Sequence, residues 1–123
     1  MREVLWVGLG GFVGANARYW LGGWIMARLG SAFPYGTFVI NISGSFILGM
    51  VMGILEGHVL SPVVRLALAI GFVGAYTTFS TWTYETLRLI ESGSLSMATM
   101  NVVGSMLMGL LAAVGGLATG RAV

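Results

Sequence analysis

The sequence predicts an all-α integral membrane protein, a single domain (residues 1–123) of four transmembrane helices. Three observations predict this fold. Of the 123 residues, 57% are hydrophobic and only 8% are charged, whereas a soluble domain carries about 25% charged residues. Four apolar segments each reach the ~20 residues that are needed to cross a bilayer. Only short connections separate these segments.

The first segment is interpreted as a membrane helix rather than a signal peptide, because Glu3 offsets Arg2 and the apolar pattern resumes after Arg18. Pro34 and Pro62 stand at or just before the second and third segments, where a missing backbone N–H costs least. The four helices are predicted at residues 4–27, 35–55, 63–90 and 95–119.

The third segment is expected to be broken. Its 28 residues would extend roughly 42 Å as one helix, which exceeds the ~30 Å hydrocarbon core. Its middle falls at Tyr76–Thr77, and Gly71 and Gly74 permit unwinding there. A break at the midplane exposes carbonyl oxygens that can hold a cation, and helix N-termini that attract anions.

All basic residues are arginines, and they give the chain almost no preferred orientation. A chain that inserts both ways can pair as an antiparallel homodimer with its twofold axis in the membrane plane, although five flanking charges are few to judge from. On such an axis two carbonyls from each broken helix would form a four-oxygen cage for a small, hard cation. Arg2, Arg65 and Arg121 fall on one side of the membrane, and Arg28 and Arg88 on the other.

Small residues recur at four-residue spacing, which in lipid lets helix backbones approach closely. Packing is the expected role of these residues. They are Gly10/Gly14, Ser45/Gly49/Gly53, Ser105/Gly109 and Gly116/Gly120.

Polar side chains inside the membrane indicate function or helix contacts. Thr37, Asn41 and Ser45 form one stripe on the second helix. The stripe either bonds to a neighbouring helix or contacts an ion, and the Asn41 amide can donate two hydrogen bonds to an anion. Asn101 and Ser105 form a similar pair on the fourth helix.

Charged groups inside the segments are few. Arg18 either extends to the interface or draws anions toward a pore mouth, and Glu85 and Arg88 can pair at i, i+3. The chain has no cysteine, and its one histidine, His58, falls near a predicted loop, so neither residue type predicts a metal site.

Phe79 and Trp82 share one face of the third helix below the predicted break. Packing is the ordinary role of such a pair, yet aromatic rings also have positive edges that can stabilise a dehydrated anion. Hydroxyl groups and the Asn41 amide can replace the lost water of a small, strongly hydrated anion. These hydroxyls belong to Thr78, Ser80, Thr81 and Thr83.

Over essentially its whole length the chain resembles the Fluc (CrcB) family of fluoride channels. The resemblance rests on the four spans, on Arg18 and on Gly36-Thr37…Asn41. Its specific part is Gly71-x-x-Gly74-x-x-Thr77-Thr78-Phe79-Ser80-Thr81 in the third helix.

The resemblance implies an antiparallel, dual-topology homodimer with two fluoride pores and a central structural sodium ion. The sodium would be held by the backbone carbonyls of Gly74 and Thr77, and no organic cofactor is expected. The pore would be lined by Phe79, Trp82, Asn41, Ser80, Thr81 and Ser105, with Arg18, Thr37 and Glu85 as pore-mouth or supporting residues.

Three residues depart from the family pattern. Trp82 stands where the family has Phe, and its indole keeps a positive edge and adds an N–H donor. Ala75 replaces the usual second glycine of the break, and Tyr76 replaces a smaller apolar residue. Neither change removes a carbonyl of the implied sodium site.

The resulting hypothesis is a passive fluoride channel of the inner (plasma) membrane, with lipid and a second copy as partners, no nucleic acid and no enzymatic activity. One alternative is a small multidrug-type proton-coupled exporter, which would need a carboxylate inside the first helix. The interior of the first helix has no such carboxylate, since Glu3 flanks the helix end. The other alternative is a non-transporting protein that only packs against membrane partners.

Overall fold

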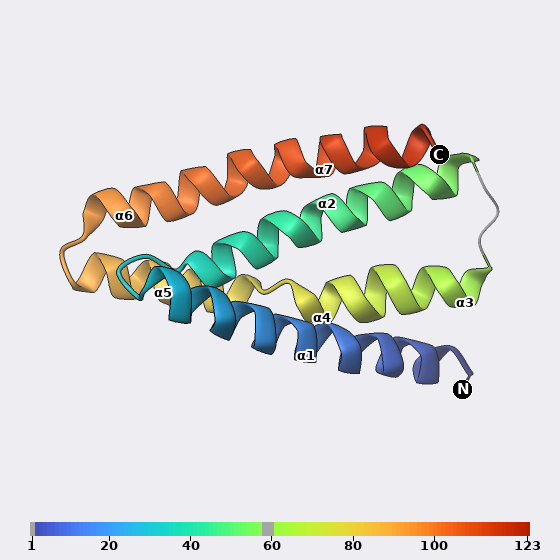
Figure 1. Cartoon of the computed structure of the whole chain (residues 1–123), viewed down its shortest axis with the longest axis horizontal. Coiled ribbons are helices and arrows are strands. Elements are labelled where there is room, and N and C mark those ends of the chain that lie inside the picture. Colours follow the sequence, from blue (N-terminus) through green and yellow to red (C-terminus); the bar gives the residue numbers. More distant parts are fainter. Residues whose placement is uncertain (1, 58–60) are drawn as a thin grey trace.

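The computed structural model describes residues 2–57 and 61–123, and these are helical apart from short turns and connections (Figure 1). His58 of the predicted loop lies outside the described residues. The chain runs through four passes, so that the two ends of the chain lie at the same end of the molecule (Figure 1). The all-helical fold and the predicted order of the four passes are therefore confirmed.

The helix bounds agree with the predicted segments within a few residues. The third and fourth passes each contain a π-helical stretch, η1 and η2, in which the helix winds with more residues per turn than an α-helix. The passes are α1 (Arg2–Leu29); α2 (Tyr35–Gly57); α3 (Pro62–Arg65), η1 (Leu66–Val73), α4 (Gly74–Tyr76) and α5 (Phe79–Glu91); and α6 (Leu95–Thr99), η2 (Met100–Gly104) and α7 (Ser105–Arg121).

Three passes among the described residues are long and apolar enough to cross a membrane, namely α2, the pass from α3 to α5, and the pass from α6 to α7. At 28 residues, α1 is also long enough. It is less apolar than the others because Asn16 and Arg18 lie in its interior and lower its mean hydropathy. The chain is a multi-pass membrane protein.

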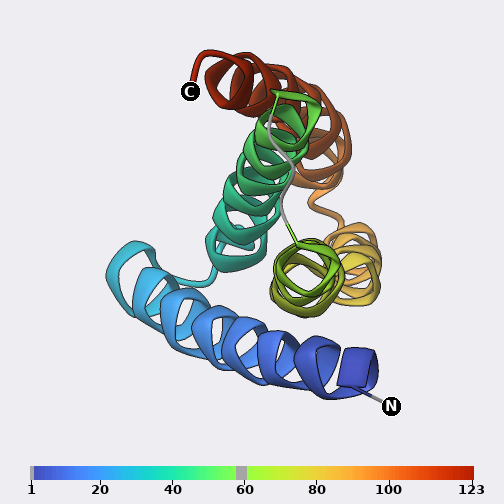
Figure 2. The same cartoon turned by 90° about the vertical axis from the view of Figure 1, so that its right-hand side faces the viewer.

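Glycines bring α2 against α7. In Figure 2, α2 lies between α7 and α1. A Cβ atom at Gly116 of α7 would overlap the carbonyl of Phe46 on α2. A Cβ at Gly49 would likewise overlap the Ala113 carbonyl. Such backbone contact is the predicted role of small residues in lipid, where dispersion rather than hydrophobic burial holds helices together.

A second glycine contact joins α1 to the third pass. A Cβ at Gly10 would overlap the Ala67 carbonyl, and one at Gly14 would overlap the Phe72 carbonyl. Gly109 is looser, since a Cβ there would only approach the Ser45 hydroxyl at 3.6 Å. The predicted packing role thus holds strongly for two pairs of helices and weakly at Gly109.

The third pass is broken at Thr77–Thr78. Thr77 (φ −78°, ψ 159°) and Thr78 (φ −150°, ψ 117°) are extended between α4 and α5. The position agrees with the sequence, but the expected role of Gly71 was wrong. Gly71 lies inside η1, where a Cβ would come within 2.6 Å of the Val7 carbonyl, so it serves helix packing rather than unwinding.

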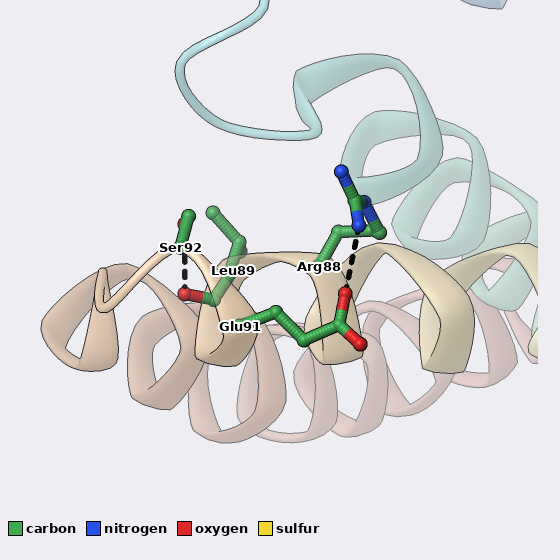
Figure 3. Close-up of polar contacts among 4 residues, drawn as sticks. All are labelled: Arg88, Leu89, Glu91 and Ser92. Atoms are coloured by element: carbon green, nitrogen blue, oxygen red, sulfur yellow. Dashed lines mark hydrogen bonds and ion pairs between the residues drawn. The ribbon is translucent and has the colours of Figure 1, made fainter.

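Exposed ion pairs lie near the ends of the helices. The predicted Glu85–Arg88 pair is wrong, because Arg88 contacts Glu91 at 2.8 Å (Figure 3). At the other end, Arg121 of α7 contacts Glu56 of α2 through two hydrogen bonds of 2.6 and 3.1 Å. Solvent-exposed pairs of this kind contribute little stability, so the glycine contacts dominate the association of the helices.

We expect Gly116→Ala to destabilise the protein by about 1–3 kcal/mol, the usual range for overpacking, because its methyl group would enter the Phe46 backbone. Thermal unfolding in detergent measures the change. Gly115→Ala is the matched control, since a Cβ there meets only the Phe46 ring at 3.9 Å. Equal melting temperatures for the two variants would contradict the packing role.

Candidate functional site

The break in the third pass is held by the side chain of Asn41 on α2. Its Oδ1 accepts the Thr78 N–H at 2.9 Å, and its Nδ2 donates to the Thr78 carbonyl at 3.2 Å. The side-chain amide thus pairs with both main-chain groups of one extended residue, as a neighbouring strand would. Thr78 is only 9% exposed, where unpaired backbone groups would be costly.

This pairing changes what Asn41 can offer an ion. The sequence suggested that the amide could donate two hydrogen bonds to an anion, but one of the two N–H groups is engaged by Thr78. Thr37 also bonds across helices, from its hydroxyl to Glu85 Oε1 at 2.9 Å. Ser45 turns back to the Asn41 carbonyl at 2.8 Å. The polar stripe of α2 therefore connects α2 to α5 as well as facing a cavity.

The same pairing releases carbonyl groups at the break. In a continuous helix the Thr78 N–H would donate to the Gly74 carbonyl, but here it donates to Asn41. The Thr77 carbonyl lies outside both flanking helices and accepts a long bond of 3.4 Å from Arg18 Nη1. A new helix then starts, with Thr78 Oγ1 accepting the Thr81 N–H at 3.3 Å as the N-cap.

Gly44 makes room for the break, a role that the sequence analysis missed. A Cβ at Gly44 would overlap the Thr77 methyl group and come within 3.2 Å of the Tyr76 ring. Beside it, the Ser43 and Tyr76 hydroxyls are 2.9 Å apart. The available signal was spacing, because Gly44 follows Asn41 by three residues and so lies on the same helix face.

Two cavities flank Thr78, which lines both. The larger, of about 550 Å³, brings together four of the predicted pore residues: Asn41, Phe79, Trp82 and Ser105. The smaller, of about 260 Å³, contains Arg18, Thr37, Thr81 and Glu85. Ser80, also predicted to line the pore, is exposed and lines neither cavity.

Phe79 and Trp82 form the aromatic part of the larger cavity. Their ring centroids are 5.4 Å apart and the ring planes are tilted by 41°. Phe79 is 75% exposed in the single chain. The Trp82 indole N–H donates to the Asn101 carbonyl at 3.1 Å. Because this N–H is engaged, the donor expected from the sequence is not free for an anion. Only the C–H edges of the indole ring remain for such a contact.

The smaller cavity is lined by one acidic and one basic side chain. The Glu85 Oε2 atom is buried and has no hydrogen-bond partner, while Oε1 accepts from Thr37. The Arg18 guanidinium borders the same cavity.

Comparison with known proteins identifies the family. Residues 5–117 match the model of the CrcB-like, Camphor Resistance (CrcB) proteins. The chain belongs to the CrcB family. A relative from Acidobacterium capsulatum is 49% identical over 98% of both chains, and one from Geotalea daltonii is 45% identical over the same shares. A third, from Oceanobacillus iheyensis, is 50% identical over 89% of this chain and 84% of its own.

All three relatives are named "Fluoride-specific ion channel FluC". The resemblance that the sequence suggested is therefore confirmed. The family is one of ion channels and not of enzymes, as the sequence predicted, and none of these relatives is named as a multidrug exporter.

We expect Asn41→Leu to destabilise the protein by roughly 2 kcal/mol, because two buried main-chain groups of Thr78 would lose their partners. Thermal unfolding measures the loss, and amide hydrogen exchange at Thr78 should accelerate. The matched control is Asn16→Leu, since Asn16 bonds only to the Phe12 carbonyl of its own helix. A slow Thr78 amide in Asn41→Leu would refute the pairing.

Proposed function

We propose that this chain forms a fluoride-selective channel that lets fluoride leave the cytoplasm passively across the inner membrane. Fluoride enters an acidified cell as the neutral acid and ionises inside, so a passive pathway is enough for export. The observation that carries the proposal is the gathering of Asn41, Phe79, Trp82 and Ser105 around one cavity beside a broken helix. The names of the relatives point to the same ion.

Selectivity would follow from partial dehydration. Fluoride, which is small and strongly hydrated, needs replacements for its lost water. The positive ring edges of Phe79 and Trp82 and the remaining N–H of Asn41 would supply them, as would the Ser105 hydroxyl once it turned from its long 3.5 Å bond to Asn101 Oδ1. None of these groups carries a full charge, so the ion is admitted without being trapped. Ser80 and Thr81 would add hydroxyls where a partner covers α5.

The exposed break supports an antiparallel homodimer. Gly74 is exposed in the single chain, and its carbonyl has lost the helical donor Thr78. Lipid offers no hydrogen bonds to such a group. A second copy with the opposite orientation would bring its own break against this one, covering both and lining two pores between the subunits.

The same carbonyls fit a sodium ion. Gly74 and Thr77 present hard oxygen atoms that the break has released from helical bonding, and two from each chain would give four ligands. The ion would supply positive charge that ties the two breaks together. Arg18, whose guanidinium already reaches the Thr77 carbonyl, would add positive charge at the pore mouth, while Thr37 and Glu85 support the wall.

We expect liposomes that contain the purified protein to release fluoride rapidly and to retain chloride, as read by ion-selective electrodes. Phe79→Ile should lower fluoride efflux by about tenfold or more, since loss of a ring edge worth ~1.4 kcal/mol at the barrier changes a rate tenfold. Phe12→Ile is the matched control, because Phe12 is similarly exposed (70%) but lies on α1 away from the cavity.

No fluoride release from a well-folded preparation would overturn the channel. Release driven by a proton gradient, with a lipophilic cation as the transported species, would favour the exporter instead. If Phe79→Ile conducts fluoride as fast as the parent protein, the channel proposal would be kept and the ring-edge mechanism would be wrong.

We expect sodium to be needed for assembly and not for each transport event. Protein purified and reconstituted with potassium in place of sodium should show reduced dimer content and reduced fluoride efflux, and both should recover when sodium is restored. Cross-linking in the membrane measures the dimer. Undiminished dimer and flux after complete sodium removal would refute the cage of Gly74 and Thr77 carbonyls.

A further inference from the structure

Asn101 is the most deeply buried polar side chain among the described residues, with 0% exposure. It lies on η2 in the fourth pass. A buried amide in a membrane protein needs partners for both its donor and its acceptor. Its Nδ2 donates to the Thr86 hydroxyl at 2.9 Å, and the Ser105 hydroxyl donates to its Oδ1 at 3.5 Å.

These bonds close a circuit around Trp82. The Thr86 hydroxyl donates to the Trp82 carbonyl at 2.8 Å, and the Trp82 indole N–H donates to the Asn101 carbonyl at 3.1 Å. Trp82 is thus tied to Asn101 at two points: through Thr86 at its main chain, and directly at its ring.

We propose that Asn101 and Thr86 are positioning residues that fix the orientation of the Trp82 ring in the larger cavity, and so set the rate of anion passage. The inference rests on the proposed channel function. Trp82 is the only tryptophan among the described residues that line the larger cavity, and the proposal gives its indole N–H a function.

Orientation matters because an aromatic ring is positive at its edge and negative on its face. An indole that turned its face toward the cavity would repel fluoride. An indole N–H without an acceptor in this low-dielectric setting would also be costly, so the bond to the Asn101 carbonyl favours one ring position. Phenylalanine has no N–H, so a phenylalanine in place of Trp82 could not use this circuit.

The first experiment uses Thr86→Val, which keeps the side-chain shape but removes the hydroxyl, and Thr86→Ser, which restores it. We expect Thr86→Val to lower fluoride efflux by about fivefold, the factor that ~1 kcal/mol for a hydrogen bond gives. Thr86→Ser should recover efflux to within about twofold of the parent. Thr119→Val is the control, because Thr119 makes the same type of bond to its own helix, at the Gly115 carbonyl, in an exposed position of α7.

A second readout follows the ring itself. In protein labelled with ¹⁵N at the tryptophan indoles, hydrogen exchange of the Trp82 N–H should be slow in the parent and in Thr86→Ser. It should be faster in Thr86→Val by about fivefold or more, if one ~1 kcal/mol contact is lost. This measurement does not depend on transport. Unchanged exchange in Thr86→Val would overturn the circuit even if the parent conducts no fluoride, in which case the channel proposal falls separately.

The decisive test repeats Thr86→Val and Asn101→Leu in a Trp82→Phe background. If both residues act through the indole, their effects on efflux should shrink to within about twofold there. Equal losses in the parent and in the Trp82→Phe background would show that Asn101 and Thr86 only hold the helices together, and would overturn the positioning role.

Discussion

The site depends on one interaction, the pairing of the Asn41 amide with the main chain of Thr78. It satisfies two backbone groups that a broken helix would otherwise leave unpaired in lipid. By capturing the Thr78 N–H it frees the Gly74 carbonyl, and by holding Thr78 extended it lets the Thr78 hydroxyl start α5. The aromatic pair and both cavities then take their positions from the start of that helix.

Helix α2 can hold the break because two of its faces contact neighbouring helices. Gly49 and Gly53 bring it against the backbone of α7, while Thr37 and Asn41 bond to α5 and to the break. Interhelical bonding and the proposed ion contact therefore do not exclude one another at this stripe. Hydrogen bonds between membrane helices contribute only about 0.6–2 kcal/mol each, so the close glycine contacts are needed beside the polar pairing to hold the helices around the site.

The sequence predicted features that depend on length and local spacing. Hydrophobic lengths located the four passes, and the excess length of the third located its break near Tyr76–Thr77. Contacts between helices were harder, because they depend on which faces meet. Spacing alone allowed Arg88 to pair with Glu85 or with Glu91, and Thr37 on another helix takes Glu85. Gly44 and the Asn101 carbonyl were missed for the same reason, since each acts on a residue of a distant segment.

The Asn41 side chain forms hydrogen bonds only with main-chain atoms of Thr78. The break in the third pass is therefore determined mainly by residues of the second helix. The contact itself would accept many side chains at position 78, whereas position 41 requires a group that both donates and accepts at this reach, and position 44 requires the absence of a side chain. The second helix therefore restricts the residues at positions 41 and 44, while the Thr78 hydroxyl that caps α5 restricts position 78 from within the third pass. A broken helix transplanted into another membrane scaffold would close again unless its partner came with it.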